Sequence, residues 1–102
     1  MGKLNDNGSI AVLYSPGYGA GWSTWNYKFP EIMFDPAIVK LVLQGKLDEL
    51  ETFVTLKYPG IYTGGLKDVE IMWLPEGTLF RIYEYDGAES IELQENVDWL
   101  VA

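Results

Sequence analysis

The sequence predicts an α+β fold in one small domain, residues 1–102, with an antiparallel β-meander, an N-terminal strand and two helices packed on the sheet. Three observations predict it. A short apolar run near the N-terminus is typical of a buried strand, and two segments with helical spacing follow it. The last third then alternates apolar and polar residues with a period of two. A length of 102 residues suits one domain.

The first strand is expected at residues 10–14, a continuous apolar run. A helix should begin at Asp35-Pro36, because Asp caps helix N-termini and proline suits the first helical position. Gly45 should end this helix, and a second helix is expected from Leu47 to Tyr58. The side chains expected to face inward are Ile38, Val39, Leu41, Val42 and Leu43 in the first helix, and Leu47, Leu50, Phe53, Val54 and Leu56 in the second.

The meander is expected after residue 68. One strand covers residues 69–74, and Pro75-Glu76-Gly77 turns the chain into a second strand at 78–85. Asp86-Gly87 is one of the strongest short hairpin signals, so residues 88–93 should return as the next strand.

The composition excludes several kinds of chemistry. The chain has no histidine, no cysteine and a net charge of −8. Zinc, haem, disulfide, thiol and Ser-His-Asp sites are therefore excluded, and we expect a binding protein without cofactor or metal rather than an enzyme. A single arginine on so acidic a chain argues against direct binding of nucleic acid. No apolar run approaches a membrane span, and the start carries no signal-peptide core. The absence of cysteine fits a cytoplasmic protein, which is expected.

The segment from Tyr14 to Phe29 is the most unusual part of the chain. It holds three alternating glycines and six of the fifteen aromatic residues. Successive backbone N–H groups of such a loop can form a concavity that binds an anion, and aromatic faces accept a flat base. A nucleotide-like small molecule would suit this combination. The alternative is a tight loop whose tryptophans fill the core.

Two further features could complete such a site. The turn Thr63-Gly64-Gly65 could form an opposite wall, or simply connect a helix to a strand. Arg81 could clamp a phosphate, or pair with Glu70 or Glu92 across neighbouring strands. The candidate ligand-binding residues are therefore Tyr14, Ser15, Gly17, Tyr18, Gly19, Gly21, Trp22, Ser23, Thr24, Trp25, Asn26, Thr63, Gly64, Gly65 and Arg81.

The end of the chain is strongly acidic. Six carboxylates lie between residues 84 and 98 with no basic residue among them: Glu84, Asp86, Glu89, Glu92, Glu95 and Asp98. This segment could form an acidic face that imitates nucleic acid and occupies a basic protein groove. The alternative is a solvated hairpin and tail.

Several runs together resemble a family of short phage-encoded proteins. They are residues 13–26, Phe34-Asp35-Pro36, residues 62–66 and residues 75–82, so the resemblance covers most of the chain. It implies no catalytic residues, and it implies a role in disabling host defences.

The leading hypothesis is a counter-defence sponge that sequesters a nucleotide-derived immune signal, with a homo-oligomer expected because one short domain has little depth to enclose a ligand. The alternative is an acidic protein–protein inhibitor, similar to DNA-mimic anti-defence or anti-CRISPR proteins, that docks on a basic surface of a host defence protein.

Overall fold

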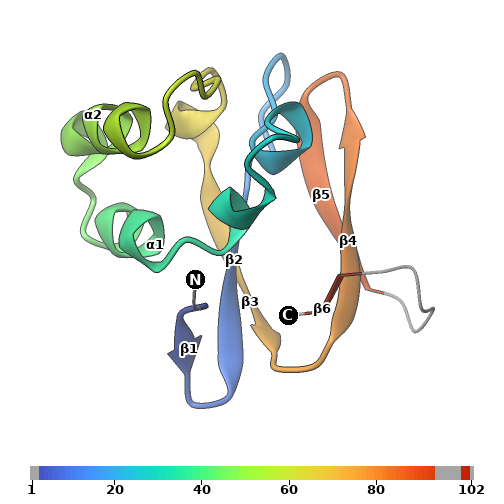
Figure 1. Cartoon of the computed structure of the whole chain (residues 1–102). Coiled ribbons are helices and arrows are strands. Elements are labelled where there is room, and N and C mark those ends of the chain that lie inside the picture. The colour runs from blue at the N-terminus through green and yellow to red at the C-terminus, as the bar shows by residue number, and fades with distance from the viewer. Residues whose placement is uncertain (1–2, 94–99, 102) are drawn as a thin grey trace.

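The computed structural model describes residues 3–93, 100 and 101, and it confirms the α+β fold (Figure 1). The helices are α1 (Pro36–Leu43) and α2 (Leu47–Lys57), with 3-10 turns η1 (Ser23–Trp25), η2 (Pro30–Met33) and η3 (Leu66–Asp68). The strands are β1 (Asn5–Asp6), β2 (Ser9–Tyr14), β3 (Glu70–Pro75), β4 (Leu79–Tyr85), β5 (Ala88–Leu93) and β6 (Leu100–Val101).

The strands form two antiparallel sheets rather than one continuous meander. One sheet has the order β1-β2-β3 and the other β5-β4-β6. The hairpin of β4 and β5 is confirmed, with Arg81 opposite Glu92. β3, however, pairs with β2, with Trp73 opposite Ala11. The turn after Pro75 therefore carries the chain from one sheet to the other.

Strand β2 explains this arrangement because both of its faces are buried. Ala11 and Leu13 pack in the cluster that contains the helices, whereas Ile10 and Val12 pack in the cluster that contains Phe80 of β4. Figure 1 shows the same layers, with α1 and α2 on one side of β2 and β3 and the β4–β5 hairpin on the other. Because β2 is apolar on both faces, each face of the first sheet must be buried. The helices bury one face, and the β4–β5 hairpin packs against the other instead of extending the sheet.

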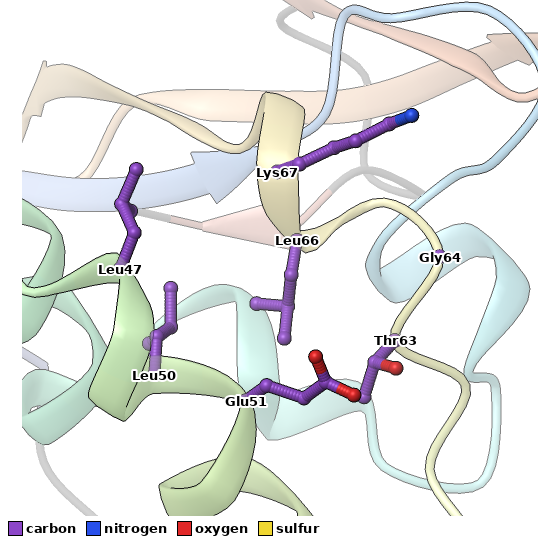
Figure 2. Close-up of a pocket in the computed structure, with 7 residues that line it drawn as sticks. All are labelled: Leu47, Leu50, Glu51, Thr63, Gly64, Leu66 and Lys67. Atoms are coloured by element: carbon purple, nitrogen blue, oxygen red, sulfur yellow. The ribbon is translucent and has the colours of Figure 1, made fainter.

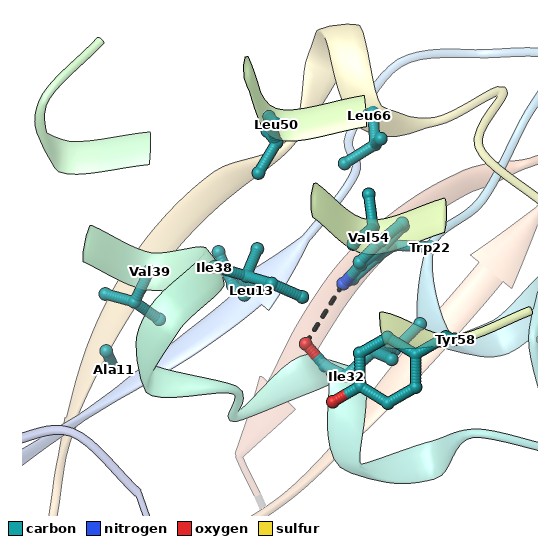
Figure 3. Packing of buried hydrophobic residues seen from close by; sticks show 10 residues of the cluster. All are labelled: Ala11, Leu13, Trp22, Ile32, Ile38, Val39, Leu50, Val54, Tyr58 and Leu66. Atoms are coloured by element: carbon teal, nitrogen blue, oxygen red, sulfur yellow. Dashed lines mark hydrogen bonds between the residues drawn. The ribbon is translucent and has the colours of Figure 1, made fainter. Parts of the chain in front are cut away.

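The larger cluster lies between the first sheet and the helices (Figure 3). Its buried members are Ala11, Leu13, Trp22, Ile32, Ile38, Val39, Leu50, Val54, Tyr58 and Leu66. The two helices therefore contribute a narrow inward stripe of only a few side chains.

Helix α1 begins and ends as its sequence predicts. The Asp35 carboxylate accepts hydrogen bonds from the backbone N–H groups of Ala37 and Ile38, at 2.9 and 3.3 Å. Gly45 follows the helix with a φ of 71°. These signals depend on the backbone preferences of a few neighbouring residues, which is why they can be recognised in the sequence.

Three leucines that were expected to face inward are exposed: Leu43, Leu47 and Leu56. The prediction was wrong for them because each helix is short and meets the core along one stripe, Ile38 and Val39 in α1 and Leu50 and Val54 in α2. Their exposure leaves apolar surface at the outer side of the helical layer.

Candidate functional site

The loop from Tyr14 to Asn26, called here the glycine/aromatic loop, does form a cradle for an anion, and its occupant is the Glu89 carboxylate of the same chain. Oε1 of Glu89 accepts from the Ser15 N–H at 2.9 Å. Oε2 accepts from the N–H of Trp22 at 2.6 Å, and from the N–H and hydroxyl of Thr24 at 3.1 and 2.5 Å. Glu89 is only 2% exposed. The predicted anion-binding geometry is present, but the Glu89 carboxylate of the same chain occupies it.

The tip of the β4–β5 hairpin closes the same loop from outside. The Gly19 N–H donates to the Asp86 carbonyl at 2.8 Å, and the Glu89 N–H donates to the Ser15 carbonyl at 2.8 Å. A Cβ atom on Gly87 would run into the backbone of Gly19 and Ala20. The glycines therefore allow two backbones to meet, and the loop is not an open phosphate site.

Trp22 is a core residue. It is fully buried, and its indole N–H donates to the Ile32 carbonyl at 3.2 Å (Figure 3). Asn26 connects the loop to the segment at Tyr62 by hydrogen bonds. Its amide donates to the carbonyls of Trp22 and Tyr62, each at 3.0 Å, and accepts from the Tyr62 N–H at 2.8 Å. Trp22 and Asn26 were both candidate ligand-binding residues, but in the structure their polar atoms are engaged inside the protein.

Trp25 is the tryptophan of this loop that reaches the surface. It is 38% exposed, and its ring lies 5.5 Å from the ring of Tyr62. Tyr18 is exposed beside the hairpin tip. The other candidates of the loop are buried or half-buried: Tyr14, Ser15, Gly17, Gly21, Ser23 and Thr24.

The turn at residues 63–65 does not face the loop across an opening. A Cβ atom on Gly65 would meet the Gly21 carbonyl, so the two segments touch through their backbones. Thr63 and Gly64 instead line a hollow on the opposite side of the turn, against helix α2.

This hollow, called here the α2 hollow, has a volume of about 240 Å³ (Figure 2). Its lining residues are Leu47, Leu50, Glu51, Thr63, Gly64, Leu66 and Lys67. Figure 2 shows the Glu51 carboxylate turned toward Thr63 and the Lys67 side chain leading away from the hollow. The residues supplied by α2 were not predicted, since in sequence they are only parts of a helix.

Arg81 is not placed to clamp a phosphate at this hollow. Its Nε lies 3.1 Å from Oε1 of Glu92 on the neighbouring strand, so the cross-strand pairing is the alternative that the structure shows.

The acidic hairpin was expected to present its carboxylates, and for Glu89 this was wrong because that carboxylate is buried. Glu84 accepts from the Gly87 N–H at 2.7 Å. Glu92 pairs with Arg81. Glu95 and Asp98 lie outside the described residues. Within the described hairpin, Asp86 at the turn is exposed.

A second buried carboxylate, Asp35, joins the two helices. Besides capping α1, it accepts from the Tyr58 hydroxyl and lies 2.8 Å from Nζ of Lys57. Burial alone would raise the pKa of Asp35, but the hydrogen bonds from Lys57, Tyr58 and the helix N–H groups outweigh it and hold that pKa below its ordinary value. Burial and the adjacent carboxylate raise the pKa of Tyr58. The group is fully engaged, so its role is structural.

Among residues 3–93, 100 and 101, no group of three or more His, Cys, Asp or Glu side chains is arranged to hold a metal ion. In the same residues no helix combines the length and the apolar character that crossing a membrane requires.

Comparison with protein-family models, with curated proteins and with solved structures found no match to this chain.

Proposed function

We propose that the protein binds a nucleotide-derived small molecule without transforming it, and that the base of this ligand enters the α2 hollow. The observation that carries the proposal is the hollow itself, which combines apolar walls with two polar groups close together at one end. Ligand sites commonly have this composition, a mostly apolar lining with a few placed polar groups.

The lining suits a base better than a phosphate. Leu47, Leu50 and Leu66 offer apolar surface to a flat ring. The Glu51 carboxylate can accept from an exocyclic amino group or a ring N–H, and the Thr63 hydroxyl can donate or accept. A phosphate beside Glu51 would be repelled, so this part of the ligand would extend outward past Lys67.

The proposed binding site lies outside the glycine/aromatic loop. That loop was expected to hold the phosphate, but Glu89 already occupies its N–H groups. Of the residues that the sequence suggests for ligand binding, Thr63 and Gly64 line the hollow.

The size of the hollow favours a shared site. At about 240 Å³ it lies below the roughly 300–1,000 Å³ of most small-molecule sites. One protomer would hold the base, and a second copy would cover the rest of the ligand. Sequestration by such a homo-oligomer would suit the counter-defence role that the phage resemblance implies.

The test is calorimetric titration with a panel of cyclic dinucleotides, cyclic trinucleotides and ADP-ribose derivatives. We expect at least one to bind. Leu47→Trp should fill the hollow and abolish that binding, whereas Leu56→Trp, a matched change at another exposed leucine of α2, should retain it. The absence of binding across the panel, or equal loss in the two variants, would contradict the proposal.

The second candidate function is inhibition of a host defence protein through an acidic surface. The observation that favours it is not the hairpin but the outer face of α2, where the exposed carboxylates Asp48, Glu49 and Glu51 lie beside apolar surface. Salt-sensitive co-purification with a defence nuclease, lost on neutralising those carboxylates, would support this alternative.

A further inference from the structure

A groove lies along the outer side of α2, beside α1. It has a volume of about 360 Å³ and is lined by Leu41, Asp48, Glu49, Thr52 and Phe53. Leu41 and Phe53 are partly buried and pack against the main core cluster, so the floor of the groove is apolar and is held in place from beneath. This part of the groove shares no lining residue with the α2 hollow, although its continuation along the helix shares Glu51 with it.

The groove continues along the helix as a second depression of about 320 Å³. Its lining is Asp48, Glu51, Thr52, Thr55 and Leu56. Leu56 is 77% exposed although it lies within a regular helix. Together the two depressions give α2 an outer face with apolar surface at both ends, and this whole face is called here the α2 groove.

The rim of the α2 groove is negative. Asp48, Glu49 and Glu51 are exposed on it. The nearest basic contact is Lys46, whose Nζ lies 4.0 Å from Glu49 in an exposed pair that neutralises little. Within the described residues, Asp48 and Glu51 have no ion-pair partner. The negative charge of the groove is therefore available to a partner.

We propose that the α2 groove docks a basic amphipathic segment of another protein, an inference that rests on the second candidate function and specifies its partner. An apolar side chain of that segment would lie against Leu41 and Phe53, and its Lys or Arg side chains would reach Asp48, Glu49 and Glu51. The occupant follows from charge complementarity. A nucleic acid would be repelled by the same carboxylates, and so would a second copy of this chain that docked through its own acidic groove.

The proposal is tested with ¹⁵N-labelled protein and a 14-residue peptide in which leucine and lysine follow helical spacing. We expect amide shift changes to concentrate at residues 41–56. The Kd should rise when ionic strength is raised, since the rim charges are exposed to solvent.

The matched variants carry the same loss of charge. Neutralising the rim with Asp48→Asn, Glu49→Gln and Glu51→Gln should weaken binding about tenfold. Neutralising three other exposed carboxylates with Glu31→Gln, Glu70→Gln and Glu76→Gln should change the Kd by less than about twofold, since none of them lines the groove.

A second pair of variants keeps the test decisive if the rim variant loses helix stability. Leu56→Ser, in the groove, should weaken peptide binding, whereas Leu43→Ser, an exposed leucine of α1 outside it, should not. Equal effects of the two charge variants, equal effects of the two serine variants, or shift changes centred elsewhere would each overturn the proposal.

Discussion

The Glu89 carboxylate accepts a hydrogen bond from the Trp22 backbone N–H at 2.6 Å, across 67 residues of sequence. The same oxygen also accepts from the backbone and hydroxyl of Thr24. A buried carboxylate with this many donors behaves as an internal ligand, and it joins the β4–β5 hairpin to the glycine/aromatic loop.

Removing this carboxylate should strongly destabilise the protein. We expect Glu89→Ala to lower the free energy of unfolding by about 3–5 kcal/mol, because it leaves several buried donors unsatisfied. Glu92→Ala, which removes the exposed partner of Arg81, should cost less than about 1 kcal/mol. Urea denaturation followed by circular dichroism measures both, and similar losses in the two variants would refute the internal-ligand role.

Two glycines test the packing of the hairpin on the loop. Gly77 and Gly87 have similar positive φ values, 91° and 86°. A Cβ atom on Gly77 would meet open space, but on Gly87 it would strike the loop backbone. Gly77→Ala should therefore cost about 1 kcal/mol for its backbone conformation alone, and Gly87→Ala about 1–3 kcal/mol more. Thermal unfolding distinguishes the two variants. Equal losses of stability would show that the loop backbone can move to accommodate the added methyl group.

The two tryptophans of the loop should respond differently to truncation. Trp22→Ala should cost about 3–5 kcal/mol, because it removes a fully buried indole. Trp25→Ala should cost far less, since its ring is partly exposed and lies against Tyr62. Chemical denaturation of both variants checks this, and a small effect of Trp22→Ala would contradict its position in the core.

Asp35 should make stability depend on pH in the acid range. Its pKa is lower in the folded protein than its unfolded value of about 3.9, so the unfolded state binds the proton first as pH falls. The stabilisation is therefore present above about pH 3.9 and is lost as pH falls through the folded pKa. Asp35→Asn should flatten this part of the curve, measured by urea denaturation between pH 2 and 6. An unchanged slope would assign the acid sensitivity to other carboxylates.

What the sequence predicted well was chemistry that acts between near neighbours. Asp35-Pro36 marks the start of α1, and Asp86-Gly87 marks the hairpin, with φ values of 51° and 86°. Such signals depend on the backbone preferences of two or three residues, so they can be recognised without knowing the rest of the fold.

What the sequence did not predict depends on distant contacts. The glycine/aromatic loop was recognised as a cradle for an anion, but nothing local indicates that Glu89 fills it. The turn after Pro75 was recognised too, but a turn signal does not determine whether the flanking strands, β3 and β4, pair with each other. The α2 hollow arises where Leu47 and Thr63 come together, which only the packing of helix against turn determines.

The internal carboxylate also has a consequence for the order of folding. The N–H groups of the loop donate to Glu89, which lies 65–74 positions later in the chain. The shape of the loop therefore depends on a contact whose formation has a high entropic cost of loop closure. Helices α1 and α2, whose contacts are local, should form early, and the loop should become ordered only when the hairpin docks. Burial of Trp22 then reports the final step of folding, and its fluorescence follows that step in a variant in which Trp25, Trp73 and Trp99 are replaced by Phe.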